Sequence, residues 1–285
     1  MHPITRTEIV DFRTDAPERK VMAAASVAVL VDEIFEGPGV APLCAALHGG
    51  GVNVFKVALY FDAAVLVGFA MVVHDTAELD GRTVVIGRAV SGLRREWRGR
   101  QTSAAFFLAC GLSLLRHHRG KELWGFVPAL HVSSYRVIAR FLPGMVPHPQ
   151  RVVSDRQLRW IDTLARRFGC ERAEGDHPLV CRRPLRVKRA RQAPRPSERP
   201  EDALDRLFFG LNPAHAEGAC VMTLFPVTHA KILGALARYA LHRVRRALGR
   251  LAAPSAGERA TTVEDEVRSG SALECRQAPP PPPTP

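Results

Sequence analysis

The spacing of apolar residues along the first half of the chain changes from strand to helix and back to strand. Residues 5–12 alternate, which predicts a first strand, and residues 20–35 carry apolar side chains at helical spacing up to a Gly-Pro-Gly stop. Residues 40–47 predict a second, short helix before three consecutive glycines. The next apolar runs predict an antiparallel meander of three strands, at residues 52–61, 65–73 and 83–93.

Helices and strands then alternate. Residues 102–117 are apolar on nearly every side and predict a covered helix, and residues 122–127 predict another strand. Two amphipathic helices follow at residues 132–142 and 155–168, the second one capped by Ser154. This order predicts an α/β protein of the α+β type, with a central mixed, mostly antiparallel sheet flanked by helices.

The last third of the chain differs in composition. Residues 1–181 form the predicted main domain, and residues 182–200 are rich in Arg and Pro, as in a linker. Residues 201–252 form a helix-strand-helix extension whose strand, at 218–225, can return to the main sheet. Its long helix, residues 228–251, places Ile232, Leu233, Val244 and Leu248 on one expected apolar stripe. Residues 253–285 predict a disordered, Pro-rich tail.

Charge and cysteine content narrow the classes of protein. The chain has 285 residues and a formal net charge of +12. Such an excess suggests an anionic partner, whereas solvated Arg faces are an equal alternative.

Six scattered cysteines indicate no disulfide framework, and the longest apolar runs are too short to span a bilayer, so we expect a soluble, cytoplasmic protein. Cys170, His177 and Cys181 lack the fourth ligand of a structural zinc site, so no metal is expected.

Residues 96–103, Glu-Trp-Arg-Gly-Arg-Gln-Thr-Ser, stand between a predicted strand and a predicted helix. Backbone N–H groups at a helix start, together with the helix dipole, favour a bound anion. Arg98 and Arg100 add positive charge at the same place. The segment therefore predicts a cradle for the phosphates of a nucleotide-type cofactor.

The order of elements and this segment resemble the GCN5-related N-acetyltransferase (GNAT) superfamily, over about residues 5–142. The family pattern is Arg/Gln, two residues, Gly, one residue, Gly/Ala. Arg98 takes the leading position, while Gln101 and Ser103 stand in place of the two family glycines. Ser103 is small enough for close approach of a phosphate. Gln101 carries a side chain where the family has bare backbone, and this departure weakens the motif.

The resemblance implies that acetyl-CoA or another acyl-CoA lies in a V-shaped gap between the strands at 83–93 and 122–127. It implies direct acyl transfer to an amine of a small molecule or peptide, with a backbone N–H near Leu93 stabilising the oxyanion. The residues it assigns to cofactor binding are Leu93, Arg98, Gly99, Arg100, Gln101, Thr102 and Ser103.

The acid and base of the reaction are less well marked. The family often uses a Tyr as acid in the helix after the second gap strand, and Tyr135 is the Tyr of that helix here; a buried core role is the alternative. His74, at a predicted strand end, is the first candidate for the base, against a solvated turn histidine. Glu96 fits turn structure better, and His131 can cap its helix or face the cleft.

Two further hypotheses remain. A GNAT-like protein without catalysis, serving as a binding module or scaffold, would fit Gln101 and the early position of Tyr135. A binder of anionic surfaces would use the basic linker and the helix at 228–251, which can make a weak contact with an anionic membrane. Nucleic-acid binding is a minor alternative, because residues 182–199 lack aromatics for base stacking. The oligomeric state is not indicated.

Overall fold

A computed structural model describes residues 3–37, 40, 53–98, 103–172, 175–182, 186–188 and 202–251, the last to the level of the backbone at some positions. The chain forms two compact units, Met1–Ala240 and Leu241–Pro285. The first unit contains all of the described strands. It extends beyond the main domain expected at 1–181, because part of the C-terminal extension packs within it.

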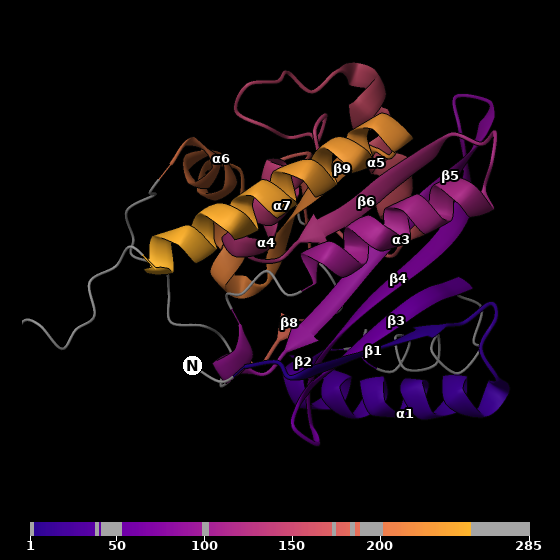
Figure 1. Cartoon of the computed structure of the whole chain (residues 1–285). Helices are drawn as coiled ribbons and strands as arrows, with labels where there is room; N and C mark the ends of the chain where they lie inside the picture. Colours follow the sequence, from indigo (N-terminus) through magenta and orange to yellow (C-terminus); the bar gives the residue numbers. More distant parts are fainter. Residues whose placement is uncertain are drawn as a thin grey trace, which may run out of the picture. The chain divides into compact units, whose positions relative to one another are not determined.

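The first unit is built on a mixed sheet of seven strands in the order β1-β3-β4-β5-β6-β9-β7. Only β5 and β6 are parallel, and every other neighbouring pair is antiparallel. The predicted sheet class and the meander are thus confirmed (Figure 1). The strands are β1 (Arg6–Asp11), β3 (Asn53–Asp62), β4 (Val65–Leu79), β5 (Arg82–Leu93), β6 (Leu123–Ala129), β7 (Val180–Arg182) and β9 (Ala219–Pro226), and a separate pair joins β2 (Phe35–Glu36) to β8 (Arg186–Val187).

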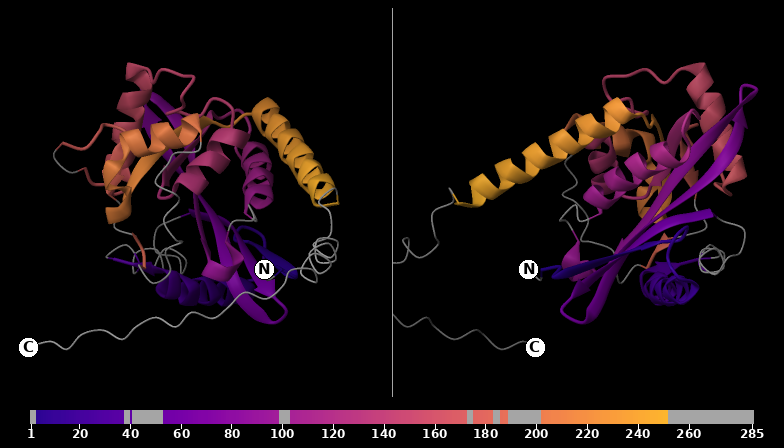
Figure 2. Two further views of the ribbon diagram at one scale, coloured as in Figure 1. Left: turned by 90° about the vertical axis from the view of Figure 1, so that its left-hand side faces the viewer. Right: turned by 45° about the vertical axis from the view of Figure 1, so that its right-hand side comes forward.

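Helices cover both faces of this sheet (Figures 1 and 2). One face packs against α1 (Pro17–Ile34) over β3 and β4, and against α5 (Asp155–Arg167) over β6 and β9. The other face packs against α3 (Ala104–His117), α4 (Val132–Phe141), α6 (Ala203–Leu211) and the part of α7 (His229–Leu251) up to Ala240. Alternate residues of β4 serve the two faces: Val72 belongs to one core cluster and Met71 to the other.

Local sequence explains the connections. The predicted Asp-Gly turn joins β4 to β5, with Asp80 and Gly81 both at positive φ, as a tight hairpin requires. The Asp80 carboxylate also accepts hydrogen bonds from Trp160 (2.9 Å) and Arg156 (2.7 Å) of α5, which tie the hairpin to that helix. Ser154 caps α5 in a capping box with Gln157, as predicted.

Three sequence predictions are untested or only partly met. The helix expected at 40–47 and most of the linker expected at 182–200 lie outside the described residues. The apolar residues expected along the long C-terminal helix are not all buried: Ile232 is buried, whereas Leu233, Val244 and Leu248 are each more than half exposed. Within the described part of the chain, no helix is long and apolar enough to cross a membrane.

A buried ion pair joins α4 to α6. The Asp205 carboxylate is 2% exposed and accepts two hydrogen bonds from the Arg136 guanidinium. The backbone N–H of Asp205 in turn donates to the side chain of Asp202, the N-cap of α6. The pair therefore fixes α6 against the helix that follows β6.

We expect Asp205→Asn to lower the free energy of unfolding by about 3 kcal/mol, because it removes the buried negative charge that the Arg136 guanidinium binds. Urea denaturation of the full chain measures this. The control is Asp162→Asn, which breaks surface ion pairs with Arg166 and Arg172 and should change the stability by less than about 1 kcal/mol. Equal losses in the two variants would contradict the structural role of Asp205.

Candidate functional site

The sheet splits between its two parallel strands. β5 and β6 pair only from Val85 to Gly87 and from Leu123 to Gly125, although β5 continues to Leu93 and β6 to Ala129. Beyond the paired segment the two strands separate. The gap that the GNAT resemblance predicts is therefore present, at the predicted pair of strands.

The unpaired part of β5 turns backbone groups toward this split. The N–H of Val85 donates to the carbonyl of Glu122 on the β6 side (2.8 Å), and the N–H of Arg94 donates to Val67 on the β4 side (2.9 Å). Backbone groups alternate in direction along a strand, so odd-numbered residues of β5 face the split. Those beyond the paired segment are Ala89, Ser91 and Leu93.

The facing edge of β6 carries a proline. The N–H of Val227 donates to Leu123, so odd-numbered residues of β6 face β9 and even-numbered ones face β5. A continued β5–β6 ladder would need an N–H at position 128, and Pro128 has none. Pro128 thus removes one donor from this edge, and the unpaired part of β5 suits an extended chain that pairs in the manner of an added strand.

The end of β5 is held by two arginines. Arg94 donates two hydrogen bonds to the Glu33 carboxylate of α1. Arg98, which follows the short helix η1 (Arg95–Trp97), donates from Nε to the carbonyl of Leu93 at 2.8 Å. Arg98, whose role as a cofactor ligand stays a prediction, therefore contacts the backbone at the end of β5.

The predicted phosphate cradle is described only in part. Gly99, Arg100, Gln101 and Thr102 lie outside the described residues, so their predicted roles stay predictions. Ser103 is the N-cap of α3, and its side chain makes no capping hydrogen bond. The N-cap of α3 is five residues after Arg98 in the sequence, and a helix start of this kind can bind a phosphate.

Tyr60 is a feature of this region that the sequence analysis missed. It lies on β3 opposite Gly68, which in turn lies opposite Leu93, so it stands level with the end of β5. Its hydroxyl is buried with no well-aligned hydrogen-bond partner among the described residues, and burial raises its pKa to about 12, although the neighbouring Ser103 favours ionisation. A buried donor of this kind is suited to a polar atom of a ligand.

His131 is the N-cap of α4, two residues after the end of β6, and its side chain makes no capping hydrogen bond. Part of its surface is in solvent, yet the surrounding protein lowers its pKa, and the charges of Arg98 and His215 lower it further. The imidazole is therefore neutral at neutral pH and can accept a proton. His131 thus follows the end of β6, and Arg98 comes five residues after the end of β5.

Tyr135 lies elsewhere in the core. Its side chain is fully buried against Phe208, and its hydroxyl donates to the carbonyl of Pro147 at 2.8 Å, while burial raises its pKa. This is the core role that the sequence left open as an alternative. A catalytic role for Tyr135 stays a prediction, and it would require the hydroxyl to leave Pro147.

His74 belongs to a cluster of three histidines at the far end of α3. Its Nδ1 lies 3.1 Å from Nε2 of His118, and the His117 ring packs against both. His74 lies opposite Gly87, six residues before Leu93, which corresponds to about 20 Å along the strand. The structure therefore does not bring His74, the predicted base, to the end of β5.

An apolar cavity of about 80 Å³ remains at the split, lined by Gly87, Ala89, Gly125 and Val127 of the strands, by α3 and by Ile232 of α7. One water molecule takes up about 30 Å³ in the liquid, and ligand pockets usually exceed roughly 300 Å³. The backbone at the split suits an extended cofactor arm, but the space beneath α7 does not admit one in this conformation.

Contacts of α7 with both neighbouring helices explain the small volume. Arg238 donates to the carbonyl of Phe141 at the end of α4 (3.0 Å), and the Tyr239 ring lies against the Phe141 ring. On the other side, a Cβ added to Gly111 of α3 would lie only 3.0 Å from the Ile232 side chain. The described part of α7 up to Ala240 therefore packs against α3 and α4 beside the split.

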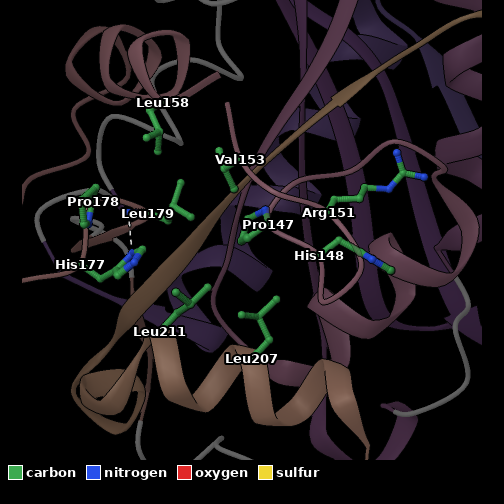
Figure 3. Close-up of a pocket in the computed structure, with 10 residues that line it drawn as sticks. All are labelled: Pro147, His148, Arg151, Val153, Leu158, His177, Pro178, Leu179, Leu207 and Leu211. Atoms are coloured by element: carbon green, nitrogen blue, oxygen red, sulfur yellow. Dashed lines mark hydrogen bonds between the residues drawn. The ribbon is translucent and has the colours of Figure 1, made fainter. Parts of the chain in front are cut away.

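A larger cavity, of about 320 Å³, lies at α5, α6 and the loops beside them (Figure 3). Figure 3 shows leucine and proline side chains around it, with His177 at one end and His148 and Arg151 at the other. Nδ1 of each histidine accepts a backbone N–H of its own turn, at 3.2 Å. None of the sequence-predicted site residues lines this cavity.

Among the residues with described positions, no cluster of His, Cys, Asp and Glu is placed to hold a metal ion.

No family model matches the chain, and no curated protein matches it in sequence. Among solved structures, a GNAT family N-acetyltransferase from Escherichia coli in complex with CoA is 16% identical with a TM-score of 0.35, over 48% of this chain and 69% of that one. A protein from Enterococcus faecalis described as a probable N-acyltransferase is 10% identical with a TM-score of 0.34, over 48% and 33% of the two chains. An aminoglycoside acetyltransferase from Legionella pneumophila is 10% identical with a TM-score of 0.30, over 47% and 75%. Similarity at this level assigns no activity, substrate or cofactor to this chain.

We expect Tyr135→Phe to lower the free energy of unfolding by about 1 kcal/mol, because the carbonyl of Pro147 loses its buried donor. Thermal and urea denaturation measure this. The matched control is Tyr60→Phe, which removes a buried hydroxyl without a well-aligned partner and should leave the stability unchanged or slightly higher. A Tyr135→Phe variant as stable as the parent would contradict the structural role.

The histidine cluster predicts sensitivity to acid. Burial, followed by neighbouring histidines, lowers the pKa of His74 and lowers that of His118 to about 4. These histidines therefore bind protons more readily in the unfolded chain than in the folded chain. As a result, the free energy of unfolding falls as the pH drops from about 7 toward about 4. We expect His118→Gln to reduce this loss in thermal denaturation, whereas His229→Gln, at an exposed histidine, should not. The same acid sensitivity in both variants would refute the assignment.

Proposed function

We propose that this chain is an acyl-CoA-dependent N-acyltransferase, with acetyl-CoA as the simplest donor, that transfers the acyl group directly to an amine. The observation that carries the proposal is the split beside β5, where Ala89, Ser91 and Leu93 turn backbone groups to an unpaired strand edge. An extended amide chain such as the pantetheine arm matches this edge. The GNAT-like order of elements around the split supports the same function.

The residues that would hold the cofactor follow from this geometry. The arm would pair with the backbone of β5, and the pyrophosphate would lie at the start of α3, near Ser103, with charge from Arg98. The Tyr60 hydroxyl supplies a further donor in this region. Bound acyl-CoA would supply an activated thioester carbonyl.

The chain itself would supply hydrogen-bond donors and a proton acceptor. The N–H of Leu93 faces the split and is the proposed donor to the developing oxyanion. We assign proton removal from the amine to His131, which is neutral and comes two residues after the end of β6. Tyr135 as acid and His74 as base remain predictions, since each is held in a contact away from the end of β5.

Cofactor entry is conditional on α7. Arg98 is bound to the carbonyl of Leu93, and the cavity under Ile232 holds about 80 Å³. The first obstacle is the long side chain of Arg98, and the second is the position of α7 over the cavity. Neither obstacle involves the hydrogen bonds between the central strands of the sheet. We therefore propose that α7 shifts away from the split when acyl-CoA binds.

The same two observations favour a second function, a GNAT-like binding module without catalysis. In that case α7 would close the split permanently, and the Arg98–Leu93 contact would be structural. The acceptor amine and a cytoplasmic location remain part of the proposal, the latter supported only by the cysteine pattern of the sequence.

Ser91→Pro tests the paired edge. It removes the N–H that faces the split and leaves the hydrogen bonds between β4 and β5, which use the other parity. We expect the affinity for acetyl-CoA, measured by isothermal titration, to fall at least about tenfold, the equivalent of one lost hydrogen bond of about 1.4 kcal/mol. Ser91→Ala keeps the backbone donor and is the control. Equal affinities in the two variants would refute the pairing.

Tyr239→Ala separates the two functions. It weakens the packing of α7 on Phe141, so we expect tighter CoA binding than in the parent, whereas Leu233→Ala, on the exposed side of α7, should have no effect. Turnover of acetyl-CoA with a panel of amines then measures catalysis. If neither the parent nor Tyr239→Ala binds CoA at millimolar ligand, the acyltransferase proposal fails and the binding module is favoured.

A further inference from the structure

The second unit begins with the last three turns of α7, and these turns expose an unusual combination of side chains. Leu241, Val244 and Leu248 are 49%, 54% and 59% exposed. At 3.6 residues per turn they fall within about 60° of the helix circumference, so they form one apolar stripe. Arg245 borders the stripe, and Arg243 follows further around the helix; both are exposed.

The charge of α7 has one sign only. The helix contains six Lys and Arg residues and no Asp or Glu, and the sequence has no acidic residue from 218 to 257. An ordinary solvated helix mixes the two signs: in α5, Arg166 pairs with Asp162 one turn away. The arginines of α7 have no acidic neighbour on their own helix, so their counter-charge has to come from elsewhere.

We propose that the stripe of Leu241, Val244 and Leu248 docks on an anionic lipid surface, with α7 lying in the plane of the interface. Apolar side chains would enter the acyl-chain boundary, while the arginines, on long flexible stems, would reach the phosphate and carboxylate groups of the lipids. Charge complementarity favours this partner. A nucleic acid would satisfy the arginines but leave the leucines in water, and a second copy of α7 would bring like charges together. The inference does not depend on the proposed acyl transfer.

The experiment is co-sedimentation of the full chain with vesicles of phosphatidylcholine alone and with vesicles of phosphatidylcholine and phosphatidylserine in equal parts. We expect binding to the second kind only, and a loss of binding at high salt. The double variant Leu241→Ser/Leu248→Ser should bind at least about tenfold more weakly, since two apolar side chains no longer leave water. Arg243→Glu/Arg245→Glu should lose the preference for phosphatidylserine.

Val152→Ser is the matched control, because Val152 is an apolar residue 93% exposed in a loop of the first unit. It should bind vesicles like the parent. All variants change exposed side chains, and thermal denaturation checks that they fold. The proposal is overturned if the chain does not bind the anionic vesicles, if the leucine variant binds as well as the parent, or if light scattering shows that the stripe instead drives self-association of the chain.

Discussion

The early end of the parallel ladder between β5 and β6 is the constraint on which the rest of the structure depends. After Gly87 and Gly125 the two strands no longer pair, and Pro128 removes one backbone donor from the facing edge of β6. Gly125 also has to remain without a side chain, because a Cβ there would meet the Phe225 ring of β9 at 2.1 Å. β6 is therefore bound tightly to β9 and released from β5. The sheet stays continuous while one strand edge in its centre remains available.

Most of the fold could be predicted from the sequence because its signals are local. Alternation predicted the meander, Asp80-Gly81 marked its last turn, and Ser154 marked the start of α5. The faces of α7 could not be predicted. Its apolar residues cover a wide arc, and only tertiary contacts decide that Ile232 is buried and that Leu233 is exposed. The helix predicted at 40–47 stays a prediction, because residues 41–47 lie outside the described part of the chain.

The candidate site shows the same limit. The position of the split and of the helix start after it could be predicted from the order of elements, because neither depends on side-chain packing. The contacts of the surrounding side chains could not be predicted. In the sequence, Tyr60 is one more residue of an apolar strand, and nothing there predicts that the Tyr135 hydroxyl donates to the carbonyl of Pro147. No motif specifies the contact of Arg98 with the carbonyl of Leu93.

The position of Ile232 and Tyr239 has a thermodynamic consequence. Their helix packs beside the split through these two side chains and continues into the exposed turns that carry Leu241. The helix has one equilibrium, between the packed and the displaced position. A molecule that binds better to the displaced form and a surface that binds better to the packed form would shift this equilibrium in opposite directions. Linkage then requires the two effects to be reciprocal: each would weaken the binding of the other by the same factor. A single helix would thus be enough to make two distant binding events antagonistic.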